Sequence, residues 1–159
     1  MIARRRDTSF PLPLWIAAIG WVAVLFYFSG QNGAESGALS LRVANFILRA
    51  CPFIDMPLEL FHPMLRKLAH FGIFAVEGFL LGLALMRSLN RGALGGALGG
   101  ALGVAICAAM AALNEYHQSF MAGRTSQASD ALIDSAGALA GALFAWLIFC
   151  ALRRRARRR

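Results

Sequence analysis

The sequence predicts an all-α membrane protein: a four-transmembrane-helix bundle with an interfacial amphipathic helix in the first outer loop. Three observations predict this class. Hydrophobic residues make up 58% of the 159 residues, charged residues only 15%, and the mean hydropathy is +0.60. A soluble domain of this size cannot bury so much apolar surface. Four apolar segments approach the length of about 20 residues that crossing a bilayer requires, and the arginines concentrate at the two ends of the chain.

The first span is predicted at residues 12–28, after the basic residues Arg4–Arg6. A signal peptide begins in a similar way, but this apolar stretch is long and aromatic, and no small-residue cleavage site follows it. We therefore favour a retained helix, with Trp15, Trp21 and Tyr27 as interface anchors. The other spans of this single domain, residues 1–159, are predicted at residues 68–86, 93–113 and 131–152.

The stretch between the first two spans carries an amphipathic pattern. Its apolar face consists of Leu39, Val43, Phe46, Ile47 and Ala50, and its polar face of Arg42, Asn45 and Arg49. This spacing predicts a helix lying in the membrane interface. Three prolines follow, and we expect them to break the chain before the second span: Pro52, Pro57 and Pro63.

Glycines recur every four residues in the third span. They form two rows, Gly92, Gly96, Gly100 and Gly95, Gly99, Gly103, and Gly137 and Gly141 repeat the spacing on the fourth span. Missing side chains let another helix approach at backbone distance. Tight packing within the chain is the favoured interpretation, and a homo-oligomer formed through the glycine-rich third span is the alternative.

The net charge of +8 comes from the ends of the chain. Without the nine arginines among residues 4–6 and 153–159, seven basic residues remain against eight acidic ones. Basic flanks on apolar spans indicate cytoplasmic ends, so we predict cytoplasmic tails at residues 1–11 and 153–159 and exclude a nucleic-acid partner. Arg87 and Arg91 place the link between the second and third spans on the same side.

Polar residues collect at the opposite, outer end of the predicted spans. Helical spacing pairs Lys67 with His70, Glu115 with Gln118, and Asp130 with Asp134, and these residues lie at the same level as Arg124, Asn114, His117, Ser29 and Gln31. Ionisable residues at such positions are candidates for function. We predict one outward-facing polar pocket, in which Arg124 is close enough along the chain to pair with Asp130 or Asp134, or serves a phosphate ligand instead. A lattice of ion pairs that only fixes the helix ends is the competing interpretation.

The spacing of the polar residues gives little support to a metal site or a cofactor site. Glu115 and His117 point apart on a helix, and no HxxxH or HExxH pattern occurs, so we predict no metal site. No P-loop or dinucleotide fingerprint is present, so no cofactor is predicted. Glu77 falls near the middle of the bilayer, where a carboxyl that fills a packing site is favoured over a proton relay.

The stretch from Asn114 to Gly137 resembles the signature of the VanZ-like family, which comprises membrane proteins associated with teicoplanin resistance. That signature runs Asp-Glu-x-x-Gln-x-Phe, then Gly-Arg, Ser, Asp and Asn-x-x-Gly. Lys67-Leu-Ala-His70-Phe71 resembles a second motif, and Ser29-Gly-Gln31 resembles the end of the first helix. The matching positions are Lys67, His70, Glu115, Gln118, Arg124, Asp130 and Gly137. Three positions depart: Asn114 replaces Asp, Asp134 replaces Asn, and Phe74 replaces Tyr.

The resemblance implies a multi-pass protein of the bacterial cytoplasmic membrane, linked to reduced susceptibility to a lipid-tailed glycopeptide. The leading hypothesis is a pocket that binds an anionic lipid head group, a cell-wall lipid precursor or the glycopeptide itself. The predicted ligand-binding residues are Lys67, His70, Glu115, Gln118, Arg124, Asp130 and Asp134. The alternative is an enzyme that modifies a lipid head group, with Glu115, Asp130 or His70 as general acid or base. A subunit that only packs against another membrane protein is a third hypothesis.

Overall fold

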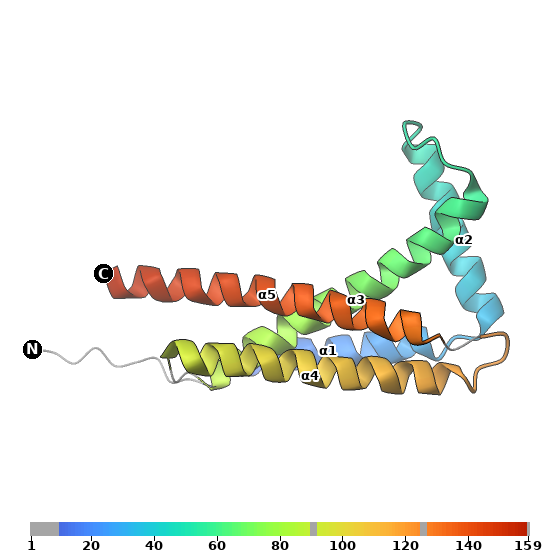
Figure 1. The fold of residues 1–159 in the computed structure, drawn as a ribbon. Helices are drawn as coiled ribbons and strands as arrows, with labels where there is room; N and C mark the ends of the chain where they lie inside the picture. Colours follow the sequence, from blue (N-terminus) through green and yellow to red (C-terminus); the bar gives the residue numbers. More distant parts are fainter. Residues whose placement is uncertain (1–9, 90–91, 125–126, 159) are drawn as a thin grey trace, which may run out of the picture.

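The computed structural model describes residues 10–89, 92–124 and 127–158, and these ranges contain five helices and no strand. The helices are α1 (Leu12–Ser29), α2 (Gly33–Ala50), α3 (Leu58–Ser88), α4 (Gly92–Gln118) and α5 (Ala128–Arg158) (Figure 1). All except α2 are long and apolar enough to span a membrane, which confirms the predicted fold class. The basic residues at positions 4–6, 91 and 159 lie outside the described residues.

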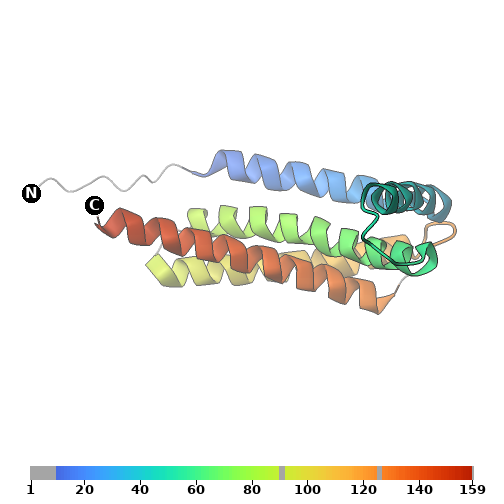
Figure 2. The ribbon, with the colours of Figure 1, turned by 90° about the horizontal axis from the view of Figure 1, so that it is seen from above.

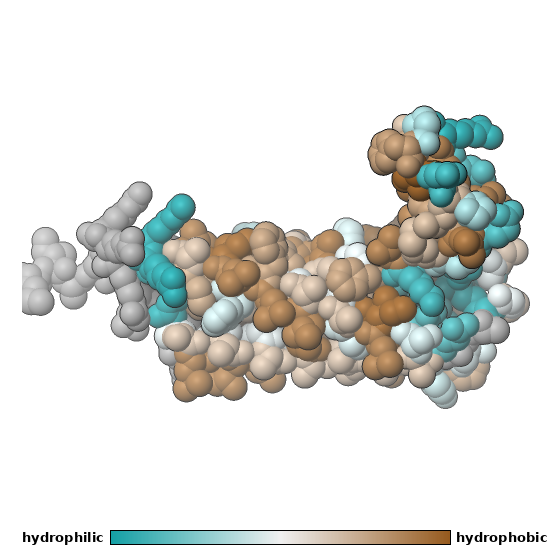
Figure 3. All heavy atoms as spheres, turned by 45° about the horizontal axis from the view of Figure 1, so that its top comes forward, coloured by the Kyte–Doolittle hydropathy of each residue, from teal (hydrophilic) through white to brown (hydrophobic). Residues whose placement is uncertain are grey.

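The four long helices run alongside one another, and α2 stands off from them at one end (Figures 1 and 2). The start of α1, the end of α3, the start of α4 and the end of α5 lie together at the opposite end. Hydrophobic atoms cover the length of the bundle, while hydrophilic atoms gather at the end of α5 and beneath α2 (Figure 3). The end that carries α2 is therefore a distinct polar region.

Helix boundaries follow from local chemistry, with one correction. Asn32 and Glu35 form a capping box, in which each side chain accepts a hydrogen bond from the other residue's backbone N–H, and α2 therefore begins at Gly33. The expected break at Pro63 is wrong, because Pro63 lies inside α3. Pro63 removes only the hydrogen bond to the carbonyl of Glu59, an exposed residue near the start of the helix.

Three of the helices extend beyond the predicted spans at the polar end or into the basic tail. α3 begins at Leu58 rather than at residue 68, and α4 continues past residue 113 to Gln118. α5 continues through the predicted C-terminal tail to Arg158. The polar residues at the ends of the predicted spans are therefore held on helices rather than in loops.

Helix α3 meets both α4 and α5 at backbone distance. A Cβ atom on Gly78 would overlap the backbone of Ala138, and one on Gly141 would overlap the carbonyl of Ala75. On α4, a Cβ atom on Gly99 would meet the backbone of α3 at 2.6 Å. These glycines therefore make their close contacts within one chain. The apolar core between the three helices includes Phe74, Leu81, Cys107, Ala111 and Ala138.

Helix α1 is joined to the rest through side chains, and α2 through side chains and one backbone hydrogen bond, from the N–H of Gly33 to the carbonyl of Ala122 at 3.0 Å. The indole N–H of Trp21 donates to the carbonyl of Ile73 at 2.9 Å, and that of Trp15 donates to Ser88 Oγ at 3.0 Å. Ser40 Oγ of α2 lies 2.7 Å from His62 Nε2 of α3. Both indole N–H groups thus bond within the protein, whereas Tyr27 is exposed.

Candidate functional site

A pocket of about 260 Å³ opens at the polar end, between the end of α1, one face of α2 and the first turns of α3. Its apolar wall comes from Leu25 and Phe28 of α1, Leu39 and Val43 of α2, and Leu65, Ala69, Ile73 and Phe74 of α3. Its polar lining consists of Ser29, Gln31, Ser36, Ser40, Arg66, His70, Asn114, Gln118 and Arg124. The pocket is therefore amphiphilic, with cationic groups on an apolar floor.

Two arginines line this pocket without an acidic partner. Arg124 Nη2 donates to the backbone carbonyl of Phe28 at 3.2 Å, and its Nε is buried without a hydrogen-bond partner. Burial and the nearby Arg66 guanidinium lower the pKa of Arg124, while Glu115 acts in the opposite direction. Within the described ranges, no carboxylate lies within 4.0 Å of either guanidinium.

Of the two roles that the sequence left open for Arg124, the ion pair with Asp130 or Asp134 is not formed among the described residues. Arg124 reaches back toward the end of α1 and uses the carbonyl of Phe28. Asp134 lies a full helical turn deeper on α5 than Asp130 and pairs with His70 of α3. Arg124 therefore faces α1, whereas Asp134 faces α3.

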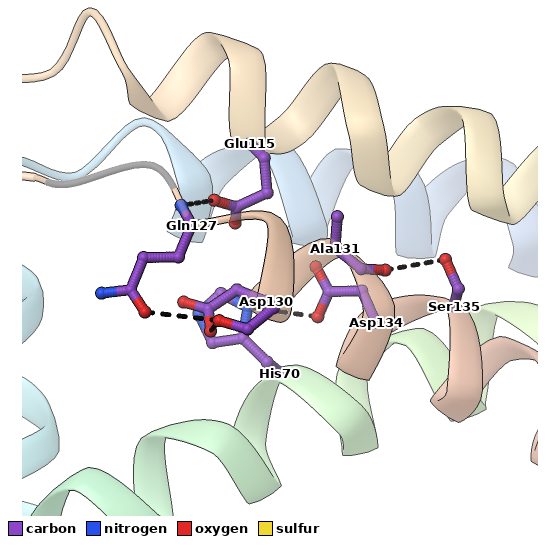
Figure 4. Close-up of polar contacts among 8 residues, drawn as sticks. His70, Glu115, Gln127, Asp130, Ala131, Asp134 and Ser135 are labelled. Atoms are coloured by element: carbon purple, nitrogen blue, oxygen red, sulfur yellow. Dashed lines mark hydrogen bonds and ion pairs between the residues drawn. The ribbon is translucent and has the colours of Figure 1, made fainter.

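Behind the pocket lies a second group, the acid–histidine cluster of His70, Glu115 and Asp134 (Figure 4). His70 Nδ1 lies 3.2 Å from Asp134 Oδ1, and Asp134 is fully buried. Glu115 Oε2 accepts a hydrogen bond from the backbone N–H of Gln127 at 3.1 Å. One nitrogen or oxygen from each of the three residues lies within 4.8 Å of the others. Three helices therefore converge on one small volume.

The cluster leaves hydrogen-bonding capacity unused. Glu115 Oε1 and Asp134 Oδ2 are buried and have no hydrogen-bond partner. Asn114 Oδ1, on the residue before Glu115, is also buried without a partner. A buried polar atom without a partner is costly, so such atoms point to a ligand, a proton or a water molecule at this position. His70 belongs to both groups, because it lines the pocket and bonds Asp134.

Two other acidic residues stay outside the cluster. Asp130, in the first turn of α5, is half-buried, and its Oδ1 accepts a hydrogen bond from Ser129 Oγ at 3.3 Å. Glu77 lies further along α3, is 1% exposed, and has one carboxyl oxygen without a hydrogen-bond partner. Neither residue lines the pocket.

The structure divides the predicted ligand-binding residues. His70, Gln118 and Arg124 line the pocket, Glu115 and Asp134 join His70 in the acid–histidine cluster, and Lys67 and Asp130 lie outside both groups. Lys67 is exposed and lines a separate shallow hollow with Pro63, Met64 and Phe71. Its neighbour Arg66 lines the pocket instead, and sequence reasoning missed it. The available signal was the spacing between Arg66 and His70. They are four residues apart, which places them on one helical face, as the spacing of three residues does for Lys67 and His70.

The comparison with protein families gives one match. A model of the VanZ/LLP1 family matches residues 14–149, which run from the first turn of α1 into the last third of α5. No curated protein and no solved structure matches the chain. The matched region contains the pocket and the acid–histidine cluster. Together with the four long apolar helices, this match identifies a multi-pass membrane protein that belongs to the VanZ/LLP1 family.

Proposed function

We propose that this protein binds the anionic head group of a membrane lipid or a cell-wall lipid precursor in the pocket between α1, α2 and α3. The observation that supports this function is the pair of arginines, Arg66 and Arg124, which line one pocket without a carboxylate partner among the described residues. Two like charges on one pocket repel, and a bound phosphate removes this repulsion. A guanidinium also matches phosphate oxygens through two parallel hydrogen bonds.

The rest of the lining suits a molecule that is polar at one end and apolar at the other. Hydroxyl groups of Ser36 and Ser40 and the amides of Gln31 and Gln118 can bond the hydroxyl and phosphate oxygens of a head group. The apolar wall, which includes Leu25 and the other α1 and α2 residues named above, can cover the first methylenes of an acyl chain. A free inorganic anion would gain no binding energy from this apolar wall.

The position of α2 supports the same proposal. Its outer surface exposes large apolar side chains, with Phe46 at 71% exposure, while Leu39 and Val43 line the pocket. A helix with this pattern, standing off from the end of the bundle, fits the membrane interface where lipid head groups lie. The pocket would then open at head-group depth.

The proposed orientation follows the charge pattern. With the arginine-rich end of α5 in the cytoplasm, the pocket faces the outer side of the bacterial cytoplasmic membrane. Lipoglycopeptide antibiotics act on that side. Capture of a cell-wall lipid precursor or of an anionic lipid there would lower susceptibility to such antibiotics, as the family resemblance implies.

The test uses the purified full chain in mild detergent. Mass spectrometry first identifies the lipids that copurify, and thermal melting then measures stabilisation by phosphatidylglycerol against phosphatidylcholine. Charge-assisted hydrogen bonds contribute about 1.5–3 kcal/mol each, so Arg124→Gln or Arg66→Gln should weaken phosphatidylglycerol binding by about tenfold or more. Arg42→Gln, an equal charge change on the exposed face of α2, is the control and should leave binding unchanged.

Two further results discriminate between hypotheses. The sequence spacing predicts that Lys67 binds the ligand, whereas the geometry favours Arg66, so Lys67→Gln should have an effect close to that of the control. Wild-type affinity in both Arg124→Gln and Arg66→Gln would refute the proposal. A chemically altered lipid among the copurifying species would instead support the enzymatic alternative.

A further inference from the structure

We propose that His70, Glu115 and Asp134 bind one divalent transition-metal cation, and that zinc is the ion that best fits these donors. The inference goes beyond the proposed function and does not depend on lipid binding. Three helices, α3, α4 and α5, each contribute one side chain, so the site is fixed by the most tightly packed part of the molecule. Sequence spacing alone could not indicate this set, because the donors are far apart along the chain.

The geometry is close to that of a bound ion. Zinc binds imidazole nitrogen and carboxylate oxygen at about 2.0–2.2 Å, so two ligands of a tetrahedral ion lie about 3.3 Å apart. His70 Nδ1 and Asp134 Oδ1 are already 3.2 Å apart. All three donor atoms lie within 4.8 Å of one another, so a small movement of the Glu115 side chain completes the set.

The unpaired oxygens and the charges favour a cation. Glu115 Oε1 and Asp134 Oδ2 are buried without partners, while the N–H of Gln127 holds the other oxygen of Glu115 in place. Two buried carboxylates close together repel each other, and one divalent ion with a neutral imidazole balances both charges. Binding would displace the proton shared by His70 and Asp134. Because His70 also lines the pocket, a fourth position on the ion could be reached from there.

The donor types select the ion. Imidazole is a poor ligand for Mg²⁺ and Ca²⁺, which prefer oxygen donors alone. A set of one imidazole and two carboxylates, with room for a further ligand, is common to zinc and manganese sites, and zinc binds such donors more tightly. Cys107, the buried thiol of the core, is not part of the set.

The first experiment measures zinc binding by the full chain after treatment with EDTA. Isothermal titration in detergent should give one zinc per chain, with weaker binding of manganese. Shape-matched variants Asp134→Asn and Glu115→Gln should each weaken zinc binding by at least tenfold, since even outer partners of metal ligands contribute about 10–100-fold. Glu59→Gln, an exposed acid of α3, is the matched control and should bind as the wild type does. Absence of stoichiometric zinc, or unchanged affinity in both cluster variants, would overturn the proposal.

A second measurement needs no variant and stays informative if a variant fails to fold. X-ray absorption by zinc bound to the wild-type protein should show only nitrogen and oxygen neighbours, including one imidazole. A sulfur neighbour at about 2.3 Å would assign the ion to Cys51, Cys107 or Cys150 and refute the cluster. Arg124→Gln separates the two proposals, because it should lose phosphatidylglycerol binding and keep zinc binding.

Discussion

Two regions of this membrane protein are built on different principles. Helix α3 approaches both α4 and α5 at backbone distance through glycines, and the three helices hold the acid–histidine cluster between them. Helices α1 and α2 form a flank that borders the pocket and is joined to the core by a few hydrogen bonds, and α1 also packs Ala18 and Leu25 against the apolar core. The glycines near the middle of these flanking helices, Gly20 and Gly37, have no neighbour within 4 Å of an added Cβ atom.

The two regions differ in how rigidly they hold the side chains that line them. Buried carboxylates need fixed partners, and the core provides one for a single oxygen of Asp134 and one for a single oxygen of Glu115. The proposed amphiphilic ligand needs a cleft with apolar walls, and the pocket between the core and the flank has such walls. His70 lies on the boundary, since it bonds Asp134 in the core and lines the pocket of the flank. Changes in the core should therefore affect folding strongly, and changes in the flank weakly.

The largest expected effect comes from breaking the buried pair in the core. His70→Leu leaves Asp134 buried without its partner, and such a loss costs on the order of 3 kcal/mol of unfolding free energy. Adding Asp134→Leu removes the unpaired acid, so the double variant should recover a large part of this loss. Thermal or denaturant unfolding in detergent, with EDTA present, measures both. A single variant as stable as the wild type would show that the pair contributes nothing to the core.

A smaller effect is expected from two glycines on the same helix. A Cβ atom on Gly78 would overlap the backbone of Ala138, whereas one on Gly72 meets nothing within 4 Å. Gly78→Ala must push α3 and α5 apart and should lower stability by about 1–3 kcal/mol. Gly72→Ala is the matched control and should be neutral or stabilising, because alanine favours the helix. Equal melting temperatures for the two variants would argue against backbone contact between α3 and α5.

The sequence predicted the helices better than the site. Long apolar segments and basic ends predict spans without any knowledge of packing, because the bilayer sets their length. The glycine rows likewise predicted close packing: Gly99 and Gly103 meet the backbone of α3, while Gly96 makes room for the Phe149 ring. The prediction for Pro63 was wrong because a helix tolerates proline near its start. The start of α3, directly after Pro57, was not evident from the sequence.

The partners of the polar residues could not be predicted in the same way. Spacing along one helix shows which residues share a face, but not which neighbouring helix that face meets. For Arg124 the sequence offered an aspartate nearby along the chain as one partner, yet Arg124 bonds the carbonyl of Phe28. The choice between Arg66 and Lys67 likewise depends on the rotation of α3, which the packing of Gly78 and its neighbours fixes.

The smallest expected effect concerns the attachment of the flank. Trp21 donates its indole N–H to the carbonyl of Ile73 at 2.9 Å, which joins α1 to α3 beside the pocket. Trp21→Phe keeps most of the ring but removes this donor, so unfolding free energy should fall by only about 0.5–1.5 kcal/mol. Because Ile73 lines the pocket, the variant should also loosen its wall, and phosphatidylglycerol should bind more weakly. Trp15→Phe is the matched control: it loses an equivalent hydrogen bond to Ser88, but at the end of the bundle away from the pocket, so phosphatidylglycerol binding should be unchanged. If Trp21→Phe destabilised the protein as much as His70→Leu, α1 would be held as firmly as the three core helices, and the division between core and flank would fail.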